Sequence, residues 1–417
     1  MKQLLTIITL LAALSMQAQQ ALMGTWTGKL DLGMAKLTLA LNITQEDGTL
    51  KCTLDSPDQS AKGIAATVKV CTDDSLSVTV PMLGASYNGR LNDGELQGTF
   101  TQLGHSLPLN LKHGEEKLNR PQTPQAPFPY TTQEVTFSNA QDSVTLAGTI
   151  TFPVGYDKAR NGSVPLVIMV SGSGLQTRDE EIFDHKPFLV AADYLARNGI
   201  ASLRYDDRGK GLSTAQNVAN ATTEDFARDA QAAYDYVKGL SLKKLGKVGI
   251  WGHSEGGDIA FMLGARGKAD FIVSLAGVGV KCDTALTAQA NRILELNGNP
   301  RRLTTEQFVN NSLASLQTGT WYRWFIQYDP TPDIKATRCP VYAANGDKDC
   351  QVISTLNLGG IKASLPQNKD NRFVEYPGLN HLFQECTTGA ATEYRTIEQT
   401  ISPQFLKDAA EWIISLK

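Results

Sequence analysis

The chain has 417 residues, of which 41% are hydrophobic and 19% are charged, and its formal net charge is −3. This length is sufficient for two domains that each have a hydrophobic core. The charges are nearly balanced and form no basic cluster. They therefore give no electrostatic reason to expect binding to nucleic acid or to an anionic membrane surface. We therefore predict no nucleic-acid partner.

The first residues have the pattern of a secretory signal peptide. One lysine precedes an apolar run from Leu4 to Leu14, and small and polar residues follow it. Because the run is too short to span a bilayer, we predict a signal peptide over residues 1–19, cleaved near Ala18 or Gln19, rather than an ordinary N-terminal helix. The expected location is periplasmic or secreted, and no later segment predicts a membrane span.

Export permits disulfides among the six cysteines of the chain. Cys52 could pair with Cys71, and Cys350 with Cys386, but the sequence does not settle the connectivity. No CxxC spacing occurs, so the cysteines do not resemble a zinc site. We predict neither a metal nor another cofactor.

The region after the signal peptide, residues 20–113, has the periodicity of half-buried strands. Apolar residues alternate with polar or small ones in segments 36–44, 76–80 and 107–111, and turn signals separate them. We predict a small all-β domain, barrel-like or a sandwich, that serves as a structural or docking module or as a ligand-binding barrel. Residues 114–130 contain four prolines and many polar residues, which is typical of a semi-rigid linker.

Strand-like and helix-like segments alternate from residue 131 to residue 417. This alternation predicts an α/β domain with a doubly wound, mostly parallel sheet. One helical segment, at about 279–335, falls between two strands and predicts a cap over the carboxyl ends of the sheet, where ligands bind. Aromatic residues of this segment either line a substrate pocket or pack the cap: Trp321, Tyr322, Trp324 and Phe325.

A Gly-x-Ser-x-Gly motif, with Ser254 at its centre, occupies residues 252–256. A buried strand is expected before it and a helix after it, which is the setting of a nucleophilic serine on a strained turn. Glycines at positions 252 and 256 remove Cβ atoms where strand and helix cross closely. We predict Ser254 as the nucleophile.

A serine hydroxyl needs a base, and the base needs an orienting carboxylate. In this topology the acid and then the histidine follow the serine along the chain. His381 is the single histidine after Ser254, and it follows the last expected strand. Asp347 and Asp349 both follow the penultimate strand and are candidates for the acid.

Two backbone N–H groups should stabilise the oxyanion that forms in such a reaction. One belongs to the residue after the nucleophile, Glu255. The other comes from the loop after the first central strand, Ser171–Gly174, in which Ser173 is the first choice and Gly174 the second.

These motifs together resemble the α/β-hydrolase superfamily over residues 131–417, and most nearly the exported bacterial carboxylesterases of the dienelactone-hydrolase-like type. The resemblance rests on SGSGLQTRDE (171–180), KPF (186–188), LRYDDRGKGLS (203–213), ATTEDFARD (221–229), GHSEGG (252–257), GDKDCQV (346–352) and NH (380–381). The N-terminal part resembles, more weakly, β-domains that precede such hydrolases in gut-type anaerobes.

The resemblance bears on the choice between the two aspartates. The family's usual spacing of glycine, aspartate and valine is matched by Gly346, Asp349 and Val352, which favours Asp349 over Asp347. The loop Ser-Gly-Ser-Gly stands where many relatives have His-Gly, which leaves the second oxyanion donor open. We interpret the charged residues at 178–180 and 206–208 as an ion-pair network that shapes the site rather than as substrate contacts.

The resemblance implies a serine carboxylesterase that hydrolyses short-chain acyl esters, small or glycan-linked, through Ser254, His381 and Asp349 and an acyl-enzyme. A serine peptidase or an acyltransferase with the same triad is the alternative. A non-catalytic binding protein on a hydrolase scaffold is disfavoured by the intact serine, acid and histidine. The sequence does not predict the oligomeric state.

Overall fold

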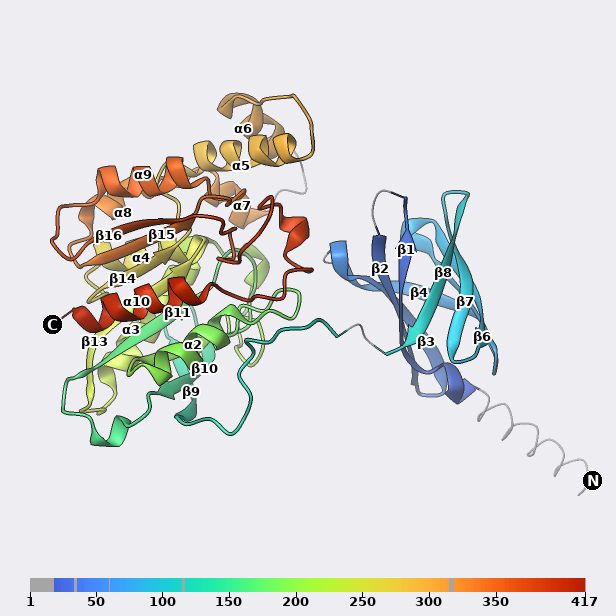
Figure 1. The fold of residues 1–417 in the computed structure, drawn as a ribbon, viewed down its shortest axis with the longest axis horizontal. Coiled ribbons are helices and arrows are strands. Elements are labelled where there is room, and N and C mark those ends of the chain that lie inside the picture. The colour runs from blue at the N-terminus through green and yellow to red at the C-terminus, as the bar shows by residue number, and fades with distance from the viewer. Residues whose placement is uncertain (1–18, 34–35, 60, 115–116, 315–318, 417) are drawn as a thin grey trace, which may run out of the picture. The chain divides into compact units, whose positions relative to one another are not determined.

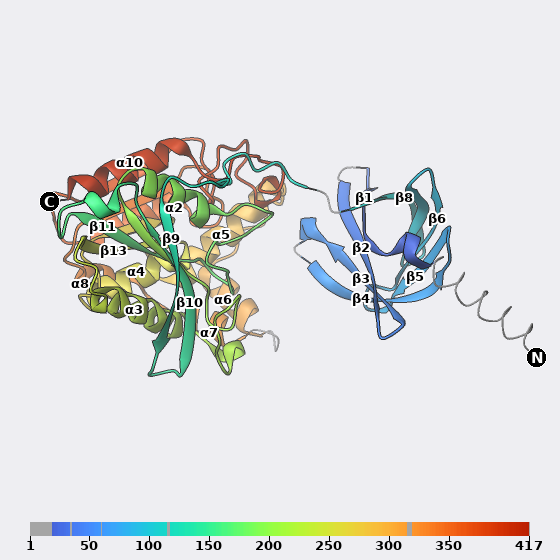
Figure 2. The same cartoon turned by 90° about the horizontal axis from the view of Figure 1, so that it is seen from below.

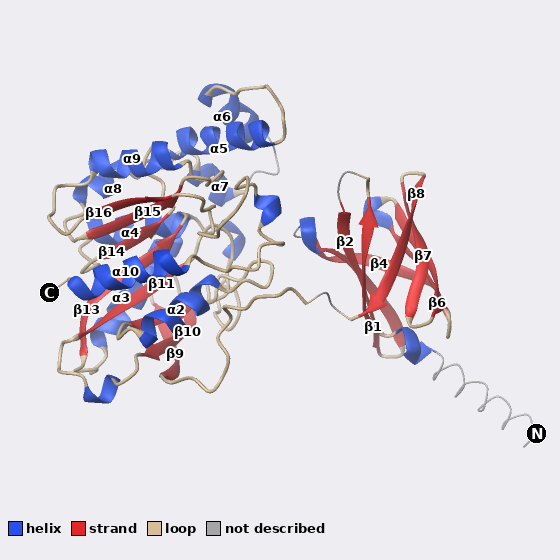
Figure 3. Ribbon diagram, in the orientation of Figure 1, coloured by secondary structure: helices blue, strands red, loops and turns tan. Residues whose placement is uncertain are grey.

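A computed structural model describes residues 19–33, 36–59, 61–114, 117–314 and 319–416. The chain divides into two compact units, Met1–Leu118 and Asn119–Lys417. Strands dominate the first unit, whereas helices and strands alternate in the second (Figure 3). The predicted signal peptide lies almost entirely outside the described residues and stays a prediction.

The first unit is a closed barrel of eight antiparallel strands, in which each strand pairs with the next and β1 also pairs with β8. Closure leaves no strand edge exposed for pairing with another chain. Short 3-10 helices lie at Gln19–Leu22, Pro57–Gln59 and Pro81–Leu83. The strands are β1 (Gly24–Asp31), β2 (Lys36–Glu46), β3 (Thr49–Ser56), β4 (Ala61–Cys71), β5 (Ser75–Val80), β6 (Ala85–Asn92), β7 (Glu95–Gln102) and β8 (His105–His113).

Side chains fill the interior of the barrel. Alternate residues of β2, namely Leu39, Leu41 and Ile43, are buried there, as the period-two pattern predicts. The Tyr87 ring is buried among them and donates its hydroxyl to the carbonyl of Leu96 at 2.9 Å. The structural or docking role and that of a ligand-binding barrel both stay predictions.

The second unit is built on one eight-stranded sheet of order β16-β15-β14-β13-β11-β12-β10-β9. Strands β11 to β16 are parallel to their neighbours, whereas β9 and β10 add an antiparallel edge beside β12. The predicted α/β fold with a mostly parallel sheet is therefore confirmed. The strands are β9 (Thr131–Asn139), β10 (Val144–Phe152), β11 (Val164–Val170), β12 (Ala201–Tyr205), β13 (Leu245–His253), β14 (Ile272–Leu275), β15 (Val341–Gly346) and β16 (Arg372–Tyr376).

Helices cover both faces of this sheet (Figure 2). Helices α2 (Pro187–Arg197) and α10 (Pro403–Ser415) pack on one face, and α3 (Thr223–Gly239), α4 (Glu255–Ala265) and α9 (Ser354–Ser364) on the other. The central strand β11 therefore contributes to two cores: Leu166 and Ile168 face α3 and α4, whereas Val167 and Met169 face α2. Burial on both faces explains its continuous apolar sequence.

Helices α5 (Cys282–Leu296), α6 (Thr305–Ala314), α7 (Thr320–Phe325) and α8 (Thr331–Ala336) lie between β14 and β15, in the segment predicted as a cap (Figure 1). Helix α8 packs against α4 and α9, and its Ile334 is fully buried in the core beneath the sheet. The last part of the inserted segment therefore belongs to the layer of helices that covers the sheet.

The second unit begins inside the span predicted as linker. The Arg120 guanidinium donates to the carbonyls of Phe183, Arg395 and Ile397 at 2.8–3.0 Å. Gln122 donates to the carbonyl of Ile401 at 2.8 Å. These carbonyls come from two loops far along the chain, so residues 119–130 are held on the rest of the second unit through partners that local sequence does not reveal.

In the part of the chain that the structure describes, no helix has both the length and the apolar character needed to cross a membrane. All six cysteines are described and all are free thiols. The pairings of Cys52 with Cys71 and of Cys350 with Cys386, which the sequence left open, are therefore not formed in this structure.

Candidate active site

Ser254 lies at the sharp turn between β13 and α4, with φ of 52° and ψ of −120°. A Cβ on Gly252 would lie 1.9 Å from the carbonyl oxygen of Gly256, and a Cβ on Gly256 would lie 2.1 Å from that of Val170. Both glycines are therefore required by the close crossing of strand and helix. The strained backbone at Ser254 has the geometry of a nucleophile turn.

Loops at the ends of two other strands bring an acid and a histidine together. His381 follows β16, and its Nδ1 lies 2.8 Å from Oδ2 of Asp349, which follows β15. The other oxygen of Asp349 accepts the N–H groups of Gln351 and Val352 at 2.7 and 2.9 Å. Because Nδ1 faces a carboxylate, Nε2 is the nitrogen of His381 that can take a proton.

Asp347, the alternative acid, has a different position. Its Oδ1 accepts the N–H of Gly378 at 2.7 Å, and its own N–H donates to the carbonyl of Tyr376. These bonds hold the turn that follows β16. The carboxylate that contacts His381 is therefore that of Asp349.

Ser254, His381 and Ser173 line one cavity of about 300 Å³. Most of its wall is apolar or aromatic, with Ile182, Val278, Leu286, Trp321, Tyr322 and Phe325 among the lining residues. Three of the four cap aromatics thus face the cavity, while Trp324 stacks on Tyr328 at 4.9 Å between ring centroids. Glu180 is the one carboxylate in the lining, which includes no lysine or arginine among the residues described.

Of the two predicted oxyanion donors, Glu255 directly follows Ser254 and Ser173 lines the same cavity as Ser254. The N–H of Glu255 begins α4, where a helix has no acceptor for it. Ser173 belongs to the loop 171–176, which follows β11, and Gly174 in this loop has φ of 95°. Side chains hold the loop at both ends: Glu180 accepts the N–H of Gly172 at 2.8 Å, and Asp207 that of Gln176 at 2.7 Å.

His253, directly before the nucleophile, is a site residue that the sequence reasoning missed. Its Nδ1 lies 2.9 Å from Oε1 of Glu180, and its Nε2 lies 2.9 Å from the carbonyl oxygen of His381. Both partners are acceptors, so both ring nitrogens donate and His253 is an imidazolium. Burial opposes this charge, but the Glu180 carboxylate outweighs burial and raises the pKa of His253.

This buried pair connects three loops. Glu180 holds the oxyanion loop through Gly172, and His253 holds the loop of His381 through its backbone carbonyl. The sequence held a signal for this pair, namely the histidine of Gly-His-Ser and the glutamate of Arg-Asp-Glu. Both residues belong to the motifs on which the family resemblance rests, but neither was given a role of its own.

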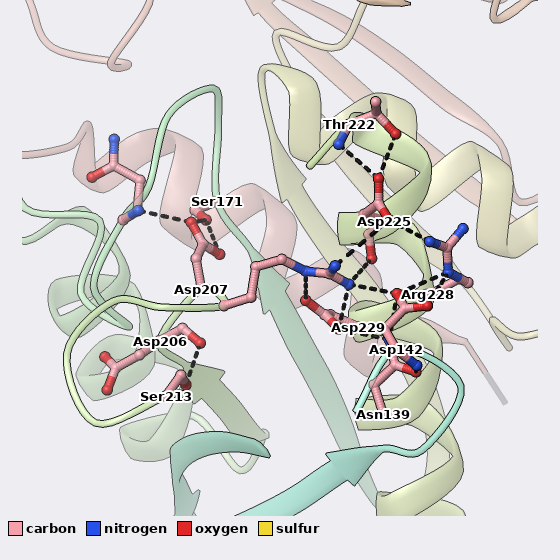
Figure 4. Close-up of polar contacts among 12 residues, drawn as sticks. Asn139, Asp142, Ser171, Asp206, Asp207, Ser213, Thr222, Asp225, Arg228 and Asp229 are labelled. Carbon is pink, nitrogen blue, oxygen red and sulfur yellow. Dashed lines mark hydrogen bonds and ion pairs between the residues drawn. The ribbon is translucent and has the colours of Figure 1, made fainter. Parts of the chain in front are cut away.

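The charged residues after β12 form ion pairs with other protein groups. Arg208 contacts Asp229 at 2.7 Å and Asp142 at 2.8 Å, and Arg178 contacts Asp206 at 2.8 Å. Figure 4 shows Asp142, Asp225 and Asp229 close together, with Arg228 beside them. These contacts support the interpretation of the segment as an ion-pair network that shapes the site.

Asp207 differs from its neighbours because it has no cationic partner in this network. It accepts the hydroxyl of Ser171 at 3.0 Å and the N–H of Gln176 at 2.7 Å, and it is buried (Figure 4). Burial raises the pKa of this carboxyl from 3.8 to about 8. In the structure, Asp207 therefore supports the oxyanion loop as a neutral acid at neutral pH.

In the described residues, no cluster of histidine, cysteine, aspartate or glutamate side chains has the arrangement of a metal site.

The raised pKa of Asp207 predicts a pH-dependent stability. The folded protein keeps this proton between about pH 4 and about pH 8, whereas the unfolded chain has lost it, so the free energy of unfolding falls as pH rises through this range. Asp207→Asn does not titrate, so its stability relative to wild type should rise between about pH 5 and about pH 9 in urea denaturation.

Asp206→Asn is the matched control for that experiment. Burial opposes ionisation of Asp206, but its bonds to Arg178 outweigh burial and lower its pKa. The difference between wild type and Asp206→Asn should therefore stay constant over the same range, because Asp206 is ionised throughout. A constant difference for Asp207→Asn as well would contradict the neutral state of Asp207.

Comparisons with known proteins find similarity over parts of this chain. Residues 187–318 match the family model of serine aminopeptidases, S33. Esterase EstD of Thermotoga maritima is 24% identical over 281 residues, which cover 64% of this chain and 65% of EstD. The chain thus spans slightly less than two thirds of the length of this curated relative.

Solved structures with similar folds include Est1E of Butyrivibrio proteoclasticus with bound ferulic acid, at 19% identity, a TM-score of 0.45 and coverage of 67% of this chain and 96% of that one. Another is a dienelactone hydrolase from Anabaena variabilis, at 18% identity, a TM-score of 0.42 and coverage of 69% and 98%. The family match over residues 187–318, taken with the sheet order and the turn at Ser254, shows that the second unit has the α/β-hydrolase fold.

Proposed function

We propose that this protein is a serine carboxylesterase that hydrolyses short-chain acyl esters through Ser254, His381 and Asp349. The observation that carries the proposal is the 2.8 Å contact between Asp349 and His381, whose ring shares a cavity with the strained Ser254. The name of the curated relative, an esterase, supports the same activity.

The proposed reaction starts with attack of the Ser254 hydroxyl oxygen on the ester carbonyl while Nε2 of His381 takes the hydroxyl proton. The carbonyl oxygen becomes an oxyanion and accepts the N–H groups of Glu255 and Ser173. When the intermediate collapses, the C–O bond to the alcohol breaks and His381 returns the proton to the alcohol.

A second cycle frees the enzyme. Water attacks the acyl-enzyme carbonyl and loses a proton to His381, and the same N–H groups hold the oxyanion. The bond to Ser254 then breaks, the serine oxygen regains a proton from His381 and the carboxylic acid leaves. Asp349 keeps the imidazole oriented and stabilises its charged form throughout.

The cavity supports a small, uncharged acyl ester. Its volume of about 300 Å³ and its aromatic and aliphatic wall suit an apolar acyl group. A negatively charged acyl group would find no lysine or arginine among the described lining residues. The alcohol part can belong to a small molecule or to a glycan.

The matching family model, of serine aminopeptidases, favours peptide hydrolysis as the second candidate. Such an enzyme needs a carboxylate for the amino group of its substrate. Glu180 is the carboxylate in the lining, but its Oε1 already accepts from His253 and Gly172. Acyl transfer to another alcohol instead of water would use the same triad.

We also propose that the protein is exported to the periplasm or secreted, on the strength of the N-terminal signal-peptide pattern. Cell fractionation and N-terminal sequencing of the mature protein test this proposal. A protein that stays in the cytoplasm with residues 1–19 intact would contradict it.

Ser254→Ala should abolish turnover of p-nitrophenyl acyl esters, because the attacking oxygen is lost. Removal of a nucleophile of this kind costs about 10⁶-fold in kcat, so the residual rate should approach background. Labelling of the intact protein by a fluorophosphonate, located at Ser254 by mass spectrometry, is the companion measurement. The proposal would be overturned by wild type that does not turn over esters, or by Ser254→Ala with full turnover. Faster release of p-nitroaniline from aminoacyl p-nitroanilides than of p-nitrophenol from the esters would favour the peptidase.

Asp349→Asn and Asp347→Asn form a matched pair that tests the acid. Asp349→Asn should lower kcat about 10⁴-fold, because the amide no longer holds His381 in the required tautomer. Asp347→Asn should stay within about tenfold of wild type, since Asp347 only holds a turn. The reverse result would assign the acid to Asp347.

Glu180→Gln should lower kcat for esters by about 10²-fold while KM changes much less, because the pair with His253 positions groups that act in the transition state. Glu181→Gln is the control, since Glu181 is exposed and pairs with Lys186 at 3.4 Å. Equal kinetics for the two variants would show that the buried pair has no part in the reaction.

A further inference from the structure

The side chain of Glu255 has no role in the reaction proposed above, which uses only its backbone N–H. Yet this carboxylate is buried, with 3% of the residue exposed, directly after the nucleophile. No ion pair involves it among the described residues. A buried carboxylate without a cation is costly unless hydrogen bonds satisfy it, so its contacts indicate what it does.

Side chains from three different segments surround the carboxylate of Glu255. Its Oε1 accepts the hydroxyl of Thr223, at the start of α3, at 2.6 Å, and the indole N–H of Trp321, in cap helix α7, at 2.9 Å. The side chain of Ser173, in the oxyanion loop, also lies beside this carboxylate. Burial raises the pKa of Glu255, and the side chains of Thr223, Trp321 and Ser173 oppose the rise.

The contact with Trp321 gives Glu255 an influence on the substrate cavity. Trp321 lines this cavity and stacks on Phe325 with 5.2 Å between ring centroids and 16° between planes. Stacking leaves the ring free to slide or turn in its plane, whereas the hydrogen bond to Glu255 determines its orientation. The carboxylate therefore fixes the orientation of one side chain in the wall of the cavity.

The contact with Ser173 gives the same carboxylate an influence on the oxyanion donors. In the proposed reaction Glu255 supplies one N–H itself, and its side chain lies beside the residue that supplies the other. Both donors then keep one spacing, as an oxyanion hole requires. Glutamate suits this position because its two oxygens are acceptors only and can serve several donors at once.

We infer that Glu255 is a positioning residue that couples the cap to the oxyanion loop, so that Trp321, held by Glu255, limits the length of the acyl group. This inference rests on the proposed esterase function. An acyl chain that displaces Trp321 would disturb the carboxylate that also holds Ser173. Selectivity for the acyl group and stabilisation of the oxyanion would therefore change together.

The test compares wild type with Glu255→Ala, Glu255→Gln and Trp321→Phe on p-nitrophenyl acetate and hexanoate. Trp321→Phe keeps a ring but removes the N–H, and should raise the hexanoate-to-acetate ratio of kcat/KM about tenfold. Glu255→Ala should raise this ratio similarly and also lower kcat for acetate about 10²-fold, because Ser173 loses its partner. Glu255→Gln keeps an acceptor oxygen and should restore most of both.

Trp324→Phe is the matched control, since Trp324 lies in the same helix but stacks on Tyr328 and does not line the cavity. Its ratio should equal that of wild type, and thermal unfolding confirms that every variant is folded. In Trp321→Phe/Glu255→Ala the two shifts in ratio should not add, because both variants remove one interaction. Unchanged ratio and kcat in folded Glu255→Ala, or an equal shift in Trp324→Phe, would overturn the inference.

If the esterase proposal fails, wild type turns over no ester, and this outcome differs from a failure of the inference about Glu255. In that case the labelling rates of Ser254 by methyl and hexyl fluorophosphonates provide the same comparison without turnover. Their ratio should shift in Trp321→Phe and Glu255→Ala but not in Trp324→Phe. An unchanged ratio would again overturn the role of Glu255.

Discussion

The close crossing of β13 and α4 at Ser254 is the constraint on which the rest of the site depends. Glycines at 252 and 256 allow the strand and the helix to approach within a distance that no side chain permits, against the carbonyl of Val170 on β11. This approach forces Ser254 into its strained backbone conformation and directs it into the cavity. It also places the next N–H, that of Glu255, at the start of a helix without an acceptor.

Buried acidic groups hold the loops around this turn. Glu180, Asp207 and Glu255 each contact the oxyanion loop, through Gly172, Gln176 and Ser173 respectively. None of these three acidic groups binds the oxyanion loop through a salt bridge. Each therefore depends on hydrogen bonds made in a buried environment. Such an arrangement contributes little net stability, but it restricts the loop to one geometry, which is what preorganised oxyanion donors require.

The sequence was sufficient for the α/β fold of residues 131–417 because buried strands and amphipathic helices have different periods, and their alternation survives without tertiary information. It was also sufficient to nominate Ser254, His381 and Asp349, whose roles stay predictions. It did not reveal that residues 119–130 fasten to the hydrolase unit, because Arg120 bonds to backbone carbonyls of residues 183, 395 and 397, and carbonyl positions have no sequence pattern. The role of His253 was missed for a similar reason, because its partners, Glu180 and the carbonyl of His381, lie far from it in the sequence.

The sequence by itself determined the order of elements, the two-part organisation and the glycines that the turn at Ser254 needs, since each depends on local periodicity or on the size of one residue. Only the tertiary structure decided which acidic side chain meets which partner. His253 pairs with Glu180, and the carboxylate of Glu255 meets Thr223 and Trp321. These contacts join segments separated by tens of residues, and their geometry follows from the packing of the whole sheet rather than from any stretch of sequence.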